Sequence, residues 1–282
     1  MESRTLLDWL VQKYPSSKRQ TLKRMVETGR VWVNGKRAIK LKQGVSPQDK
    51  IDVLDRPTSA VNERAGSSLS IVYEDDDIIV VEKPAGLLTS TIPREKRPTL
   101  LANVRQYVAR HGPKHTVGLI HRLDRDASGL LIFSKNDAAY ESLKSQFFHH
   151  TVEREYHAVV HGVPRPPAAR LQTHLVERTD GTVHSTRQVG KGQIAVSRYV
   201  LLKTERKLSL VRVMLETGRK HQIRVHMAGN GTPVVGDKVY GPASNAARLM
   251  LAATRLTIVH PRTGREMAFT CPIPSDFPVK AD

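Results

Sequence analysis

The sequence has little of what a secreted or membrane-spanning protein needs. It holds one cysteine, Cys271, in 282 residues, so no disulfide can form within the chain and a reducing compartment is expected. No apolar run approaches the roughly 18 residues of a membrane-spanning helix. The amino terminus shows no cationic leader followed by an apolar stretch. We therefore expect a cytoplasmic protein with no membrane partner.

Acidic residues are also scarce. Lysine and arginine together number 45, against 27 aspartate and glutamate residues, which gives a formal charge of +18. A cationic surface gains free energy when it displaces counterions from phosphates, so this excess indicates a polyanionic partner. The chain is long enough for one large domain or two smaller ones.

Residues 1–56 have the pattern of a small separate module. Apolar residues recur at helical spacing over 6–11, a second helix is expected over 18–28, and an Asn-Gly pair favours a hairpin over 31–39. This module carries 13 basic and 6 acidic residues, so its positive charge per residue is more than twice that of the remaining chain. The polar stretch 57–69 has the composition of a linker.

The basic side chains of the module gather along its second helix. Leu22, Met25 and Val26 form the stripe that is expected to face inward. A charged face of this kind is either merely solvated or a nucleic-acid contact. The residues concerned are Lys18, Arg19, Lys23 and Arg24, with Arg30 just beyond the helix.

Charge is concentrated again between two short apolar runs at 117–120 and 130–133, which read as strands. The string between them packs one histidine, two arginines and two aspartates into residues 121–126. Strand–loop–strand segments can aim polar side chains from a rigid frame. The alternative is an ordinary charged hairpin loop.

A second candidate segment, at 217–227, reads Thr-Gly-Arg-Lys-His-Gln-Ile-Arg-Val-His-Met. Its Thr-Gly pair breaks the preceding strand, and a helix is expected to follow. His221 and Arg224 lie three positions apart and so share a helix face. His221 and His226 are five apart, which does not suit two ligands on one face, and no cysteine is near. No metal site is expected here.

The string His-Arg-Leu-Asp-Arg-Asp-Ala-Ser-Gly-Leu at 121–130 closely resembles a signature of the RNA pseudouridine synthases. The similarity is strongest to the branch that acts on large-subunit ribosomal RNA and some transfer RNAs. The helices and hairpin of residues 1–56 resemble an S4 RNA-binding domain. Other segments are similar to further family motifs, namely Lys-Pro-Ala-Gly-Leu-Leu at 83–88, Glu-Arg-Glu-Tyr at 153–156, the segment at 217–227, Gly-Asp-Lys-Val-Tyr-Gly at 236–241 and Arg-Leu-Met-Leu-Ala-Ala at 248–253.

The resemblance implies an α+β fold. A mixed, mostly antiparallel central sheet is expected in a catalytic domain over residues 70–282, preceded by a small α/β S4 domain over 1–56 and the linker 57–69. After the first motif the family often continues Val-Val-His-Pro. This chain has Leu88, Thr89 and Ser90 there, in a loop from which we infer no function.

The resemblance also implies the site. Asp124 takes the place of the catalytic nucleophile, while Asp126 varies in the family and is rejected. Tyr156 corresponds to a tyrosine that lies against the target base, and is the nearest candidate to remove the C5 proton. Arg224 is the implied counter-charge of Asp124. The residues expected to hold RNA or the target uridine are His121, Arg122, Leu123, Arg219, His221, Gln222 and Leu251. Ala252 stands where the family usually has histidine.

The expected reaction isomerises uridine to pseudouridine in RNA through a covalent Asp124 intermediate. Neither a metal nor an organic cofactor is expected, because no redox or phosphoryl step occurs. The S4 domain favours ribosomal RNA over transfer RNA, and a monomer is expected. The competing interpretations are a transfer-RNA synthase and a non-catalytic S4-containing ribosome-assembly protein. The intact Asp124, Tyr156 and Arg224 oppose the second.

Overall fold

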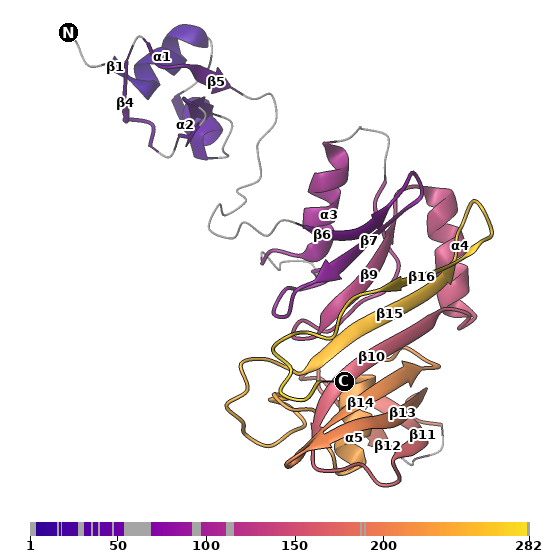
Figure 1. Ribbon diagram of the computed structural model, residues 1–282. Coiled ribbons are helices and arrows are strands. Elements are labelled where there is room, and N and C mark those ends of the chain that lie inside the picture. Colours follow the sequence, from indigo (N-terminus) through magenta and orange to yellow (C-terminus); the bar gives the residue numbers. More distant parts are fainter. Residues whose placement is uncertain are drawn as a thin grey trace. The chain divides into compact units, whose positions relative to one another are not determined.

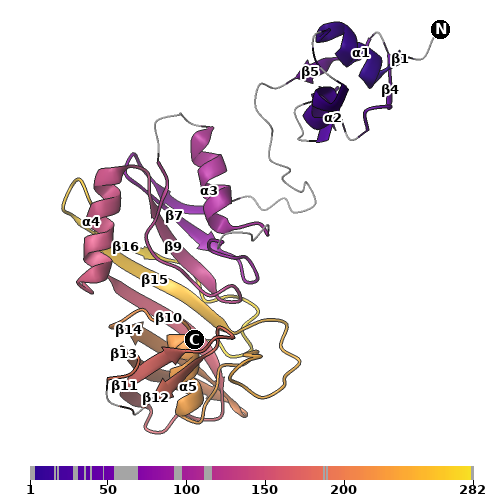
Figure 2. The ribbon, with the colours of Figure 1, turned by 180° about the vertical axis from the view of Figure 1, so that it is seen from behind.

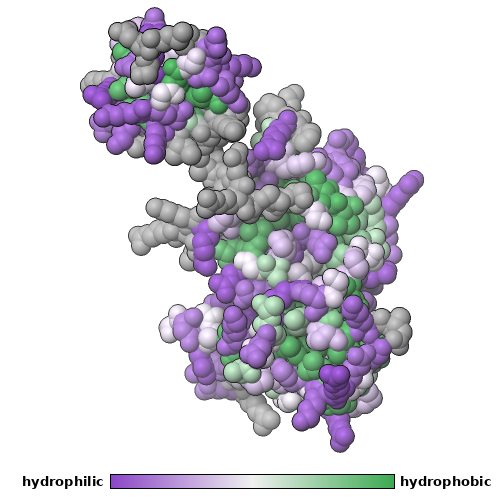
Figure 3. Space-filling view, turned by 60° about the vertical axis from the view of Figure 1, so that its left-hand side comes forward, coloured by the Kyte–Doolittle hydropathy of each residue, from purple (hydrophilic) through white to green (hydrophobic). Residues whose placement is uncertain are grey.

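The computed structural model describes residues 4–280, apart from 16, 18, 28–30, 35, 39, 47, 54–68, 92–96, 111–115, 187 and 189 and the side chains of 24, 27, 36 and 37. The chain divides into two compact units, Met1–Ser67 and Ser68–Asp282 (Figure 1). Hydrophilic side chains cover most of the face of the first unit that Figure 3 shows. Among the described residues, no helix is long and apolar enough to cross a membrane.

The first unit begins with two helices, as its apolar spacing predicts. Thr5 caps the first helix, because its hydroxyl accepts the Asp8 amide while the Asp8 carboxylate accepts the Thr5 amide. Leu22 and Val26 of the second helix are buried, as expected. The hairpin is present as well, with Trp32 paired to Arg37. The elements are β1 Arg4–Thr5, α1 Leu6–Lys13, α2 Arg19–Glu27, β2 Val31–Val33, β3 Lys36–Arg37, β4 Gly44–Val45 and β5 Ile51–Val53.

One mixed sheet forms the second unit. Its strands lie in the order β12-β11-β13-β14-β10-β15-β9-β7-β6, with β16 added on β15 and β8 on β9. The pairings are antiparallel except that of β15 with β9. The bounds are β6 Ser70–Glu74, β7 Ile78–Lys83, β8 Gly118–Leu119, β9 Ser128–Ser134, β10 Glu153–His161, β11 Ala168–Glu177, β12 Val183–Thr186, β13 Gln193–Glu205, β14 Leu208–Leu215, β15 Leu251–Val259 and β16 Glu266–Thr270.

Helices cover both faces of this sheet (Figures 1 and 2). The side chains of α3 Leu100–Ala109 and α5 Gln222–Gly229 pack into one apolar cluster with Ile79, Leu131 and Tyr156. The alternate residues Val80 and Ile132 point to the other face, where α4 Asp137–Phe148 packs. Asn136 caps α4 by accepting the Ala139 amide at 2.8 Å. The expected α+β fold with a mostly antiparallel sheet is therefore confirmed.

The parallel pairing of β9 with β15 covers only Ser128 and Gly129 on β9. Further along β9, the short strand β8 takes over the same edge and pairs with Phe133 and Ser134. The segment 120–127 lies between these two pairings in sequence, so it connects β8 to the start of β9 along this edge. This is the charged string that the sequence singles out.

The structure predicts that Gly129 tolerates no side chain. Its φ is +108°, and an added Cβ would overlap the backbone carbonyl of Ala253 on β15. Gly129→Ala should therefore lower the free energy of unfolding by more than ~3 kcal/mol, because two paired strands must separate. Gly264→Ala is the matched control, since Gly264 has a φ of +66° with open space around it. Backbone strain alone should cost that variant about 1–2 kcal/mol. Equal losses in denaturant titrations would contradict the close approach.

Candidate active site

Backbone anchors hold the segment around Asp124. The Thr89 hydroxyl donates to the Leu123 carbonyl at 2.8 Å and accepts the Leu123 amide at 3.2 Å. The Lys83 ammonium donates to the Arg125 carbonyl at 2.8 Å, and the Gly86 amide donates to the same carbonyl at 2.9 Å. Asp124 is thus fixed from both neighbouring residues, while its own side chain remains 21 % exposed.

Lys83 is fully buried at the end of β7. Besides the Arg125 carbonyl, its ammonium donates to the carbonyls of Pro84 and Leu87 at 2.9 and 2.8 Å. Burial lowers the pKa of Lys83 to about 8, against the nearby carboxylates of Asp126 and Asp124. All three protons of the ammonium group therefore have acceptors, and the lysine ties the turn after β7 to the Asp124 segment.

His121 occupies the part of the β9 edge that has no strand partner. Its Nε2 accepts the Ile132 amide at 3.2 Å, and its ring stacks on Phe147 of α4 with the centroids 4.6 Å apart. Burial, and then the charge of Arg154, lower the pKa of His121 to about 3. The ring is therefore neutral and bonded within the sheet. That geometry favours a structural task, and its contact with RNA stays a prediction.

The second half of the site comes from the segment before α5 and from α5 itself. His221 immediately precedes the helix with φ +54°, and Arg224 lies in the first turn. The Arg224 guanidinium Nη1 donates to the Asp124 carboxylate at 3.1 Å. His221 Nε2 lies 4.0 Å from the same carboxylate oxygen. Both residues meet Asp124, but the prediction that they share a helix face was wrong, because His221 lies before α5 and not on it.

Arg224 is shared between two carboxylates. Its Nε and Nη2 donate to Asp237 at 2.7 and 2.8 Å, and the Asp237 side chain is completely buried. Burial alone would lower the pKa of Arg224, but Asp237 and Asp124 raise it. Burial alone would raise the pKa of Asp237, but Arg224 and the amides of Val239 and Tyr240 lower it. Asp237 therefore holds the guanidinium in a fork that leaves Nη1 for Asp124.

Tyr240 fixes the orientation of His221. The Tyr240 hydroxyl accepts the Val183 amide at 2.7 Å and is hydrogen-bonded to His221 Nδ1, also 2.7 Å away. When the hydroxyl donates to Nδ1, the proton of the imidazole is on Nε2, the nitrogen that faces Asp124. Burial lowers the pKa of His221, against the charge of Asp124. His221 Nε2 and the Arg224 guanidinium thus both face the Asp124 carboxylate.

Tyr156 lies on β10, on the face that carries α5. Its buried ring belongs to the same apolar cluster as Leu123, Ile223 and Leu251. Burial raises the pKa of Tyr156, Arg154 opposes this, and the charge of Asp124 adds to it. The hydroxyl is therefore protonated at neutral pH. The structure thus gathers Leu123, Asp124, Tyr156, Arg224 and Leu251 on one side of the sheet.

Gln222 turns its amide inward rather than toward solvent. It is buried, its oxygen accepts the Thr217 hydroxyl and the Arg219 amide, and its nitrogen donates to Val196 and Ser197. These bonds favour the task of shaping the turn before α5, and its predicted RNA contact has no geometric support. Arg122 is exposed.

Other predicted residues are placed less centrally. Arg219 is half-buried, with its Nε donating to the Ile194 carbonyl. Asp126 is held by Arg125 at 2.9 Å, and Arg224 donates to Asp124 instead. In the first unit Arg19 and Lys23 are exposed on α2. The prediction for Lys18, Arg30 and the side chain of Arg24 lies outside the described residues.

Four positioning residues escaped the sequence analysis: Lys83, Thr89, Asp237 and Tyr240. Three of them lie in motifs that were noticed without a role being assigned. Thr89 lies in the loop from which no function was inferred, and the structure shows that its side chain is buried and bonds to the backbone beside Asp124. A buried arginine needs more than one acceptor, which was the signal that could have pointed to Asp237.

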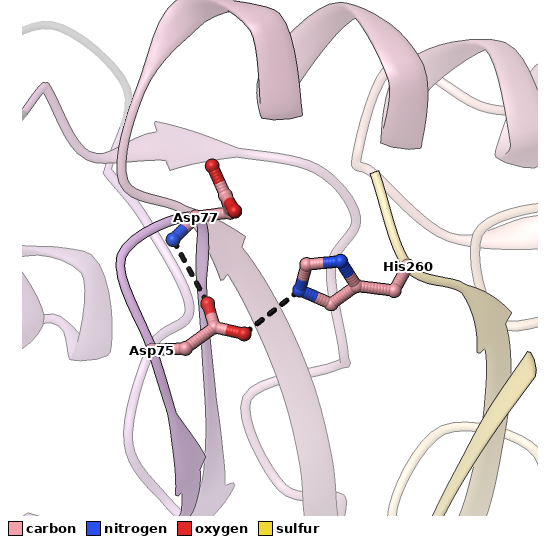
Figure 4. Close-up of side chains that lie close together, drawn as sticks. All are labelled: Asp75, Asp77 and His260. Carbon is pink, nitrogen blue, oxygen red and sulfur yellow. Dashed lines mark hydrogen bonds and ion pairs between the residues drawn. The ribbon is translucent and has the colours of Figure 1, made fainter. Parts of the chain in front are cut away.

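One group among the described residues has the spacing of a metal site, namely Asp75, Asp77 and His260 (Figure 4). Its acceptors are already engaged. Asp75 accepts the amides of Asp77 and Ile78, the Tyr73 hydroxyl and His260 Nε2. Asp77 pairs with the Arg262 guanidinium at 2.6 Å. The Arg262 guanidinium thus supplies the positive charge that a metal ion would supply. We describe the three residues as a structural contact that joins the β6–β7 turn to the β15–β16 turn.

Comparisons with known proteins agree with this geometry. The family model described as RNA pseudouridylate synthase matches residues 77–229, and the S4 domain model matches residues 4–51. An uncharacterized RNA pseudouridine synthase, YlyB, of Bacillus subtilis (strain 168) is 35% identical over 276 residues, covering 92% of this chain and 87% of that protein.

Two further similarities are informative. The ribosomal large subunit pseudouridine synthase D of Pseudomonas aeruginosa is 34% identical over 286 residues, covering 94% of this chain and 87% of that protein. Among solved structures, the human RNA pseudouridylate synthase domain containing 1 superposes with a TM-score of 0.60 at 28% identity, covering 72% of this chain and 83% of that one.

The shared arginine leads to a prediction about Asp237. Asp237→Asn turns an amide N–H toward the guanidinium and leaves a buried cation with one carboxylate. We expect the free energy of unfolding to fall by about 3–5 kcal/mol. Asp276→Asn is the matched control, because Asp276 binds Arg248 with the same fork at 2.7 and 2.8 Å but is 51 % exposed. That variant should lose only ~0–1 kcal/mol. Equal losses in urea unfolding would show that burial of Asp237 does not matter.

Proposed function

This chain belongs to the RNA pseudouridine synthase family, and we propose that it isomerises uridines of large-subunit ribosomal RNA. Family membership makes it an RNA-modifying isomerase. The ribosomal target is supported by the named activity of the relatives from Pseudomonas aeruginosa and Escherichia coli O157:H7, which are 34% and 33% identical to this chain. We further propose that it acts as a monomer in the cytoplasm. A transfer-RNA target and a non-catalytic role are not favoured.

The observation that carries the proposal is the Asp124–Arg224 pair. Its 3.1 Å hydrogen bond joins a partly exposed carboxylate to a buried guanidinium. A nucleophilic carboxylate must be held in place with an oxygen open to the substrate, and the guanidinium holds this one. Asp126, the other carboxylate of the segment, is occupied by Arg125. Asp124 therefore combines charge, access and fixed position.

The reaction balances with these residues. The bond from ribose C1′ to N1 of uracil breaks, the bond from C1′ to C5 forms, and the proton of C5 is replaced by one on N1. Asp124 forms the transient covalent bond, at C1′ or at C6, and is released when the new bond closes. Because uracil leaves as a resonance-stabilised anion, no second carboxylate is needed to protonate it, unlike in most glycoside hydrolysis.

The target base must leave its stack to be turned over. The apolar cluster around Tyr156, Leu123 and Leu251 provides a surface beside Asp124 for an extruded ring. We assign the aromatic ring of Tyr156 to contact with that base. Its hydroxyl, protonated in the resting enzyme, is the nearest candidate to act on the C5 proton: it gives its own proton to N1, which gains one in the reaction, and accepts the proton of C5.

The first experiment tests the function itself. We expect pseudouridine to disappear from defined positions of large-subunit ribosomal RNA when the gene is deleted. The wild-type gene should restore it and Asp124→Asn should not, because the amide is nearly isosteric but carries no charge. Asp126→Asn is the control and should restore modification. A map in which only transfer RNA changes would overturn the ribosomal target, and restoration by Asp124→Asn would overturn the catalytic assignment.

Tyr156→Phe separates the ring from the hydroxyl. We expect RNA binding to persist and single-turnover product formation to fall by about 10²–10⁴-fold, the range of a lost general base. A rate within threefold of wild type, at unchanged affinity, would leave Tyr156 as a contact for the base only.

Deletion of residues 1–56 tests the S4 domain. This segment carries 13 basic and 6 acidic residues, so we expect weaker RNA binding and a flatter salt dependence. Each lost phosphate contact should reduce the slope of log K against log salt by about 0.7 for single-stranded RNA. Chemistry on a short stem-loop should remain measurable. An unchanged slope would show that the domain does not anchor RNA.

A further inference from the structure

The end of α4 carries an aromatic ring in solvent. Phe148, the last residue of the helix, is 78 % exposed, and it is the one aromatic among the large apolar residues found exposed in the described chain. Its neighbour Phe147 points inward instead, against His121. Burying an aromatic ring stabilises a fold substantially. An aromatic ring that stays exposed on a helix therefore either cannot be packed there or belongs to an interaction site.

The ring is held in place by its surroundings. His149 Nδ1 donates to the Ser145 carbonyl at 2.9 Å, which fixes the imidazole at the end of the helix. Phe148 meets that imidazole edge to face, with ring centroids 5.1 Å apart at 85°. His150 then leaves the helix with φ +58°. The aromatic side chain is therefore supported on one flank while most of it faces solvent.

Basic side chains lie near this position. The Arg154 guanidinium lies 5.5 Å from the ring centroid of Phe147, the residue before Phe148. Burial lowers the pKa of His150, and the charges of Arg154, Arg219 and His149 lower it further, so these groups lie near one another. The exposed aromatic thus lies beside a rim of arginines and histidines, and proteins bind single-stranded nucleic acid by combining aromatic and cationic side chains.

This rim is continuous with the candidate active site. His121, which stacks on Phe147, begins the segment that carries Asp124. On the other side, an added Cβ at Gly218 would fall on the Arg154 guanidinium, so Arg154 reaches the turn that presents His221 and Arg224. Both halves of the site thus meet the end of α4, one through His121 and the other through Arg154.

We propose that Phe148 is a stacking platform for an unpaired base of the RNA substrate next to the target uridine, with Arg154 and Arg219 receiving the adjoining phosphates. The proposal rests on RNA being the substrate and not on which RNA it is. A flipped target leaves its neighbours partly unstacked, and an aromatic surface beside the pocket replaces the stacking that they lose. Since every base has an aromatic face, this contact positions the RNA without reading its sequence.

The test compares substitutions at Phe148 in the full-length protein. The probe is total RNA from gene-deleted cells grown with 5-tritiated uridine, in which every natural target is unmodified. Phe148→Ala and Phe148→Leu should weaken filter-measured binding by about five- to hundredfold, the range of one lost base stack. Phe148→Trp should bind within about twofold of wild type. Single-turnover tritium release at saturating enzyme should change little in all three, because the ring does not touch the reacting atoms.

Two controls make the result specific. Val163→Ala removes a side chain that is 44 % exposed beyond the opposite end of β10, and it should bind like wild type. The salt slope of Phe148→Ala should equal that of wild type, because no phosphate contact is lost. Wild-type affinity in Phe148→Ala would overturn the proposal, as would full rescue by Phe148→Leu or a reduced salt slope. Tritium release from the transfer-RNA fraction alone would overturn the ribosomal target without affecting the comparison at Phe148.

Discussion

The site depends on one guanidinium that serves two carboxylates. Arg224 is buried, and an unpaired buried cation is strongly unfavourable. Asp237 meets this requirement with two hydrogen bonds. The remaining Nη1 is directed at Asp124, whose side chain is open enough to meet a substrate. Asp237 balances the charge of the arginine and sets its orientation. If Asp124 loses its charge on bonding to the substrate, Arg224 therefore still has a carboxylate partner.

The sheet supplies the other half of this arrangement. Because β9 pairs with β15 only over Ser128 and Gly129, and with β8 only at its far end, an edge of β9 is left for the segment before it. His121 fills that edge by accepting the Ile132 amide. Thr89 and Lys83 then hold the backbone on either side of Asp124. Asp124, the proposed nucleophile, thus lies on a loop whose backbone is fixed by side chains, and catalysis requires such fixed positions.

Sequence patterns predicted helices, strands and motifs, but not the contacts between residues that are far apart in the chain. The sequence placed His221 and Arg224 on one helix face, whereas His221 precedes the helix in a left-handed conformation and reaches Asp124 from there. The resemblance identified Asp124, but nothing in the sequence shows that Thr89 bonds to Leu123, since 34 positions separate them. His121 and Gln222 were expected to hold RNA because they are polar and lie in motifs. The structure directs both toward backbone groups, a difference that depends on packing and not on residue type.

A synthase with one carboxylate places unusual demands on its surroundings. A hydrolase can divide acid and base duties between two carboxyl groups whose pKa values differ. In the proposed reaction Asp124 is the one carboxylate, and it must keep one position through bond breaking and bond making. Interactions that act only on the resting carboxylate would not accelerate the reaction, whereas the preorganised guanidinium of Arg224 stabilises charge as it returns to Asp124. Binding energy for RNA therefore has to come from groups outside this centre, and we propose the basic S4 domain and the rim around Phe148 as those groups.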